Sequence, residues 1–234
     1  MPEPALIVHR DQRDPEGNLI PEHLTEIRRV LHDQGFVLLP SDTAYSVAAW
    51  PRTSRTRLQI NEMLQRANEP LSLAFPSVDV VQQWTTPNAL ADRLLEQFTP
   101  GPITVVRSAS RHTPADFTRE LLGGQNHTIG VRIPNSAEER QVAGVGASPI
   151  TTVPVQYVRV DPRCPVTSFP DALAIFAERV AAIEGTPPWC AIEGTIQYQL
   201  TSTVVEILGE SGSYKIKRQG AIPDAEIEAC ANER

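Results

Sequence analysis

Residues 35–47 have the sequence GFVLLPSDTAYSV, in which two apolar runs flank a short polar segment. The first run, residues 36–39, consists of four consecutive apolar side chains that end at Pro40, and it predicts a strand buried on both faces. Residues 43–49 are apolar and β-favouring, and they predict a second strand. Gly35 ends the preceding segment, where apolar residues at helical spacing predict a helix over 21–34.

The rest of the chain alternates irregularly between helical and extended patterns. Helices are predicted at residues 53–66, 77–84, 88–98, 137–143 and 171–183, and strands at 71–75, 103–107, 128–133, 149–153, 190–193, 201–207 and 214–218. A polar stretch over 108–127 is expected to form a lid or surface loop. Because a steady β-α-β rhythm is missing, the pattern predicts an α/β fold of the α+β kind, with helices packed on a mixed sheet. We expect one domain at 20–223, an N-terminal extension at 1–19 and an acidic tail at 224–234 that frays.

The bulk composition is that of an ordinary globular protein. The chain has 234 residues, is 41% hydrophobic and 21% charged, and carries a formal net charge of -7. This acidic balance argues against a dedicated nucleic-acid-binding domain, which usually has a basic excess. The spacing of Cys164, Cys190 and Cys230 fits neither a zinc site nor a thioredoxin-type motif. Since the apolar runs are too short for a membrane span, we expect a cytoplasmic protein that contacts no membrane, and we assign no metal ligands.

Six segments, taken in chain order, resemble the YrdC/TsaC family of threonylcarbamoyl-AMP synthases. Residues 35–47 are similar to the family's G-x-V-x-x-P-T-D-T-x-Y-G-L, and residues 64–73 are similar to its K-x-R followed by K-P-L-S-L. The other four segments are FTPGPITVV at 98–106, TIGVRIP at 128–134, STVV at 202–205 and RQGAI at 218–222. Each motif is weak by itself, but the six in this order cover nearly the whole chain.

The resemblance implies a twisted mixed β-sheet around a large concave cavity that holds ATP with Mg²⁺, threonine and bicarbonate. The implied reaction makes threonylcarbamoyl-AMP and pyrophosphate for the modification of a tRNA adenosine. Arginine forks match phosphate oxygens, and hydroxyls add further donors. Carried over residue by residue, the resemblance implies catalytic roles for Arg66 and Thr43, nucleotide or phosphate binding by Arg132, Ser202 and Arg218, and substrate binding by Tyr45, Thr152 and Gln156.

Two of the family's motifs are altered in this chain. The lysine of K-x-R is replaced by Leu64, and the serine and asparagine of S-x-N are replaced by Pro154 and Gln156. A smaller change places Ser46 where the family has glycine. The loss of one polar contact in a transition state costs about 3 kcal/mol, or about a hundredfold in rate. We therefore expect an altered or reduced synthase activity.

The sequence leaves other functions open. The chain could be a non-catalytic module that binds a nucleotide or double-stranded RNA, or an enzyme that handles a carbamoyl-adenylate in small-molecule biosynthesis. Arg66 and Arg132 could instead form structural ion pairs, although the resemblance favours a ligand role, and Thr43 and Ser202 could be strand residues chosen for β-propensity. The arginines at 52, 55 and 57 could contact a tRNA backbone, although a solvated helix face is the favoured explanation.

Overall fold

The computed structural model describes residues 3–66, 69–114, 117–123, 127–146, 148–156, 165–209 and 212–232. The strands are β1 (Leu6–Val8), β2 (Phe36–Pro40), β3 (Tyr45–Ala49), β4 (Ser72–Ala74), β5 (Ile103–Ser108), β6 (Thr128–Arg132), β7 (Ile150–Pro154), β8 (Trp189–Ile192), β9 (Thr203–Leu208) and β10 (Ser213–Arg218). The helices are α1 (Pro21–His32), α2 (Ser54–Met63), α3 (Val78–Trp84), α4 (Ala89–Phe98), α5 (Ala137–Ala143), α6 (Phe169–Ala181) and α7 (Asp224–Asn232), with short turns η1 (Arg10–Gln12) and η2 (Phe117–Leu121). Within the described ranges, every helix is too short or too polar to cross a membrane.

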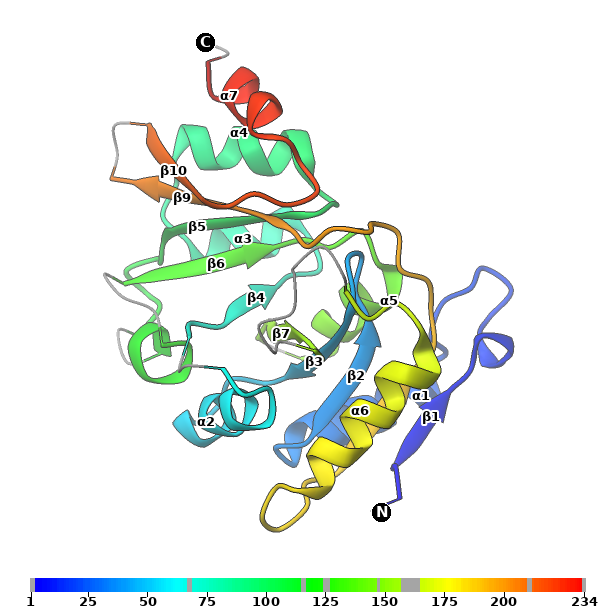
Figure 1. Ribbon diagram of the computed structural model, residues 1–234. Helices are drawn as coiled ribbons and strands as arrows, with labels where there is room; N and C mark the ends of the chain where they lie inside the picture. The colour runs from blue at the N-terminus through cyan, green and yellow to red at the C-terminus, as the bar shows by residue number, and fades with distance from the viewer. Residues whose placement is uncertain are drawn as a thin grey trace.

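The strands form one mixed sheet in the order β1-β8-β2-β3-β7-β4-β6-β5-β9-β10. Figure 1 shows the sheet running from β10 at the upper left to β1 at the lower right. The pairs β1–β8, β8–β2, β4–β6 and β5–β9 are parallel, and the remaining pairs are antiparallel. The predicted α/β fold, a mixed sheet with flanking helices, is confirmed.

Strand β2 is buried on both faces, as its continuous apolar run predicts. Phe36 and Leu38 belong to a hydrophobic cluster that includes the inner face of α6. Val37 and Leu39 point the other way, into a second cluster that includes the inner faces of α1 and α5. All four side chains have 0% of their surface exposed. Each such burial contributes about 1.5–3 kcal/mol to the free energy of folding.

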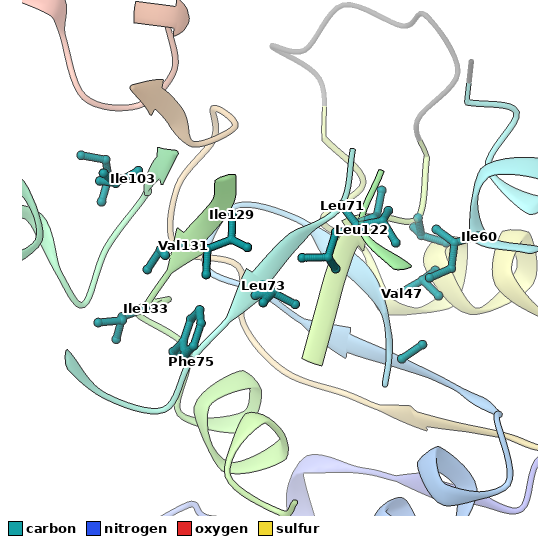
Figure 2. Close-up of a cluster of buried hydrophobic side chains, with 14 of the residues drawn as sticks. Val47, Ile60, Leu71, Leu73, Phe75, Ile103, Leu122, Ile129, Val131 and Ile133 are labelled. Atoms are coloured by element: carbon teal, nitrogen blue, oxygen red, sulfur yellow. The ribbon is translucent and has the colours of Figure 1, made fainter. Parts of the chain in front are cut away.

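The other half of the sheet alternates between apolar and polar side chains. Figure 2 shows Leu73 of β4 close to Val131 of β6, with Ile129 and Phe75 in the same apolar layer. Leu73 and Val131 are cross-strand partners in the parallel β4–β6 pair. The residues between these apolar positions point to the opposite face, since successive side chains alternate along a strand. That opposite face carries the cavity described below.

Both ends of the chain contribute to the fold. Residues 6–8, which the sequence analysis places in an extension, form β1 and pair in parallel with β8. At the other end, α7 packs on α4, with Ile227 and Cys230 buried. The prediction that the acidic tail frays is therefore wrong for residues 224–232, because two apolar residues three positions apart bury one face of the helix. Cys190 is also buried, whereas Cys164 lies outside the described residues.

Truncating Ile227 to alanine should lower the free energy of unfolding by about 2–4 kcal/mol, because the side chain is fully buried and the change leaves a cavity. Urea unfolding followed by circular dichroism measures the loss. Glu228→Ala, on the exposed face of the same helix, is the matched control and should stay within about 0.5 kcal/mol. An equal, small effect of both changes would show that α7 adds little to the fold.

Candidate functional site

A cavity of about 490 Å³ lies on the polar face of the sheet. Cavities of this size hold small organic ligands. Its wall comes from strands β7, β4, β6, β5, β9 and β10 together with the segments that precede β3, β4 and β9. The charged lining residues are Arg66, Glu69, Arg132, Glu206, Lys217 and Arg218. The hydroxyl-bearing ones are Thr43, Ser72, Thr104, Thr128, Thr152, Thr201 and Ser202. Four cations face two carboxylates, so the cavity suits an anionic, hydrogen-bonding ligand.

Strand β6 illustrates how the alternation builds this wall. Gly130 and Arg132 face the cavity, while Ile129 and Val131 face the hydrophobic core. A Cβ atom at Gly130 would lie 2.6 Å from the Ser72 Oγ atom, so a larger residue here would force the serine hydroxyl to rotate away. The missing side chain leaves the middle of the cavity floor open.

Arg132 is anchored by Asp42, whose carboxylate is completely buried. The Arg132 Nη2 atom lies 2.6 Å from Asp42 Oδ1. The other carboxylate oxygen accepts the backbone N–H of Asn135, and the Asp42 carbonyl accepts the N–H groups of Gln197 and Tyr198. Asp42 therefore connects the β2–β3 turn to the segment after β6 and to the segment after β8. Arg132 both forms an ion pair and lines the cavity.

The STVV and RQGAI motifs meet at one side of the cavity. The Arg218 Nε and Nη2 atoms donate to the Ser202 carbonyl at 3.1 and 3.0 Å, and Nη2 also donates to Ser202 Oγ at 3.0 Å. Ser202 Oγ in turn lies 3.0 Å from Thr104 Oγ1. Gly220 allows this contact, because a Cβ there would lie 2.2 Å from the Thr201 carbonyl oxygen. The guanidinium and two hydroxyls are thus held together at the cavity wall.

Arg66 and Thr43 reach the cavity from two turns. Arg66 follows α2, and its side chain is only 6% exposed. Its Nη2 atom donates to the Pro70 carbonyl at 3.0 Å and lies 3.5 Å from a Glu69 carboxylate oxygen. Gln65, just before it, has a left-handed φ of 52° that redirects the chain at the end of the helix. Thr43 lies in the β2–β3 turn and is 2% exposed.

The structure brings together six of the eight site residues that the resemblance implies: Thr43, Arg66, Arg132, Thr152, Ser202 and Arg218 all line the cavity. Tyr45 and Gln156 are outside this lining. The Tyr45 hydroxyl accepts from the Gly194 N–H and donates to the Gly194 carbonyl, both at 2.9 Å, and its ring packs against Phe169. Tyr45 therefore lies in the core, where it holds the segment after β8.

The Sua5/YciO/YrdC family model, described as Telomere recombination, matches residues 29–220. The chain belongs to this family. A Methanocaldococcus jannaschii protein provisionally named threonylcarbamoyl-AMP synthase is 22% identical over 195 residues, which cover 83% of this chain and 84% of the relative.

Solved structures of the same family share the fold. P. abyssi Sua5 complexed with L-threonine superposes with a TM-score of 0.68 at 22% identity, over 90% of this chain and 58% of that one. E. coli YciO superposes with a TM-score of 0.72 at 16% identity, over 95% of this chain and 97% of that one. The chain thus spans somewhat over half of the Sua5 chain and nearly all of the YciO chain.

Two departures from the Sua5/YciO/YrdC motifs face each other in this chain. Pro154 of β7 is the cross-strand partner of Ser46 of β3. The next residue, Val155, donates its N–H to the Tyr45 carbonyl at 2.9 Å, so the pair Ser46–Pro154 falls at the position where ladder hydrogen bonds do not form. The missing N–H of proline therefore removes no bond to β3. The third departure, Leu64, is 0% exposed within the core and leaves the cavity without the family's lysine.

A carboxyl group is buried behind the cavity wall at Glu139 of α5. Burial raises the pKa of Glu139 above its ordinary value of 4.5, and the nearby Arg132 guanidinium opposes part of this shift. Because the pKa of Glu139 is higher in the folded state, its protonation adds to the free energy of unfolding. This contribution is fully present at pH values below the unfolded-state pKa. This contribution is lost as the pH rises through the folded-state pKa.

We expect Glu139→Gln to remove this pH dependence, because glutamine fills the same space without an ionisable group. Unfolding measured at pH values between about 5 and 8 should show wild-type stability falling relative to the variant as the pH rises. Glu138→Gln is the contrasting control, since it breaks the 2.5 Å ion pair with Arg13 and should destabilise the protein at pH 8. Parallel pH profiles for wild type and Glu139→Gln would contradict the prediction.

Several residues of the cavity have no role implied by the sequence motifs. Ser72 and Thr104 lie inside the quoted motifs, and their alternation with core residues is a signal that could have placed them on the cavity face. Glu206 and Lys217 lie outside the family's motif residues. Lys217 follows Ile216 and precedes Arg218 on β10, and strict alternation puts only one of Lys217 and Arg218 on the cavity side.

Proposed function

We propose that the cavity binds ATP or an adenylate and that the chain acts as a threonylcarbamoyl-AMP synthase-like enzyme with altered or reduced activity. One observation carries this proposal: three arginines from motifs far apart in the sequence, Arg66, Arg132 and Arg218, line one cavity together with three of the implied hydroxyl groups. Guanidinium forks and hydroxyl donors are the groups that bind phosphate oxygens. The names of the M. jannaschii relative and of the Sua5 complex with L-threonine support the same substrate class.

The proposed chemistry needs positioning more than a nucleophilic side chain. The threonine amine and bicarbonate first condense to a carbamate with loss of water. An oxygen of this carbamate then attacks the α-phosphorus of ATP, a new P–O bond forms, and the P–O bond to the departing pyrophosphate breaks. Arg66, Arg132 and Arg218 would hold the phosphates and balance the charge that develops on the leaving group. Mg²⁺ would enter with ATP as part of the substrate, since nucleotide phosphates are its usual ligands in such sites. Leu64 and Pro154 supply neither the ammonium nor the hydroxyl of the family's motifs, which supports a reduced rate.

A second candidate is a module that binds the nucleotide without turning it over. The observation that favours it is the burial of Leu64 in the core at the end of α2, so that the lysine lining the cavity is Lys217 of β10. A carbamoyl-adenylate-handling enzyme would use the same cavity. For double-stranded RNA or tRNA, the structure adds no support. Two of the arginines considered for RNA contact instead interact within the protein. The Arg52 guanidinium lies 4.5 Å from the Trp50 ring centroid, and Arg57 donates to the Glu120 carbonyl.

Calorimetric titration of the purified chain with ATP and Mg²⁺, with AMP and with threonylcarbamoyl-adenylate tests the proposal. Binding of at least one of the three is the expected result. Release of pyrophosphate in the presence of ATP, threonine and bicarbonate would then separate an enzyme from a binding module. The absence of binding to all three ligands would overturn the adenylate proposal.

A further inference from the structure

Lys217 lines the cavity although neither composition nor motif points to it. The sequence contains two lysines, Lys215 and Lys217, and both lie on β10. This strand forms one edge of the sheet next to β9, as Figure 1 shows. Only Lys217 of the two lysines is part of the cavity wall. Position 64, at the end of helix α2, supplies no ammonium, and Lys217 supplies one to the cavity from strand β10.

An irregularity in β10 turns two successive cations toward the cavity. Ile216 pairs with Val205, but Arg218 pairs with Val204, so two steps along β10 match one step along β9. Lys217 is the extra residue of this β-bulge, which breaks the alternation of side chains. Lys217 and Arg218 consequently both reach the cavity. A regular strand would send one of them to the other face.

The present partner of Lys217 holds it weakly. Its Nζ atom lies 3.3 Å from Glu206 Oε2, and the two side chains are 48% and 28% exposed. Partly exposed pairs of this kind are worth about 1 kcal/mol or less. Glu206 also lines the cavity, where its charge opposes an anionic ligand. An anion that enters therefore competes with Glu206 for the ammonium at small cost.

We propose that Lys217 is a ligand-binding residue at the opening of the cavity, where its ammonium leaves Glu206 and joins Arg218 on the anionic oxygens of the ligand. These oxygens belong to the phosphates of a nucleotide or to a carboxylate. The inference rests on the proposed function in one respect only, that the cavity binds an anion. Glu206 has the opposite effect, because it competes for the same ammonium and repels the ligand.

The test is calorimetric titration at low salt with inorganic pyrophosphate, with ATP and Mg²⁺, and with L-threonine. The variants are Lys217→Gln, Glu206→Gln and the matched control Lys215→Gln, which removes the same charge from the same strand at the cross-strand partner of Glu206, outside the cavity lining. Lys217→Gln should weaken binding of the phosphate ligands about three- to tenfold, and Glu206→Gln should tighten it about two- to threefold. Lys215→Gln should change it by less than about twofold.

The outcomes separate this inference from the proposed function. Weaker binding of Lys217→Gln to pyrophosphate supports the inference even if ATP does not bind, whereas an effect confined to L-threonine supports it with a carboxylate as the bound group. Equal affinities of Lys217→Gln and Lys215→Gln for every ligand that binds would overturn it while leaving the proposed function intact. A weakening by both Lys217→Gln and Glu206→Gln would also overturn it, since that pattern indicates a structural ion pair. A wild-type chain that binds none of the ligands overturns both.

Discussion

Replacing Arg132 by leucine is expected to lower the free energy of unfolding by about 3–5 kcal/mol, because it leaves a buried charge without its partner. Asp42 is 0% exposed, and Arg132 Nη2 lies 2.6 Å from its carboxylate. The remaining hydrogen bonds to that carboxylate, from the N–H of Asn135 and the hydroxyl of Ser41, come from neutral donors and cannot balance the charge. Urea unfolding at neutral pH, followed by circular dichroism, measures the loss.

The control for Arg132→Leu is the double variant with Asp42→Asn, in which the buried charge is removed together with its partner. The asparagine oxygen can still accept the N–H of Asn135. We expect the double variant to recover more than about 1 kcal/mol relative to Arg132→Leu. A loss below about 1 kcal/mol for the single variant would show that water or another cation reaches Asp42 once the arginine is gone.

Arg66→Ala should weaken the binding of ATP with Mg²⁺ about ten- to hundredfold, provided that the cavity binds the nucleotide as proposed. Its side chain is 6% exposed and lines the cavity, and hydrogen bonds from charged groups contribute about 1.5–3 kcal/mol. Isothermal titration calorimetry gives the ratio of dissociation constants. Arg55→Ala, on the exposed face of the adjoining helix α2, should leave the affinity unchanged.

Arg66→Lys distinguishes the planar fork from the charge alone. A lysine keeps the positive charge but cannot bind two phosphate oxygens side by side. We expect it to recover only part of the lost affinity. If Arg66→Ala binds ATP as tightly as the wild type does, Arg66 serves the turn through its bond to the Pro70 carbonyl and is not a ligand residue.

The sequence predicts most elements of this fold for a simple reason, the spacing of apolar residues. The run at 36–39 has no polar face, and the structure buries it between α6 on one side and α1 and α5 on the other. The segment 128–133 alternates, and the structure gives it one core face and one cavity face. The acidic composition of the tail predicts fraying, but the spacing of Ile227 and Cys230 lets a helix bury one face there.

The chain by itself thus determined the order of strands and helices, the mixed sheet and the motif residues that line the cavity, because local periodicity and short motifs are properties of neighbouring residues. Tertiary structure alone decided the rest. It paired Asp42 with Arg132, used the Tyr45 hydroxyl to hold Gly194, and brought both Lys217 and Arg218 to the cavity through a bulge in the β9–β10 pair. Each of these contacts depends on how two segments are aligned, either segments distant in the sequence or neighbouring strands. A shift of one residue in the register between two strands reverses the direction of a side chain.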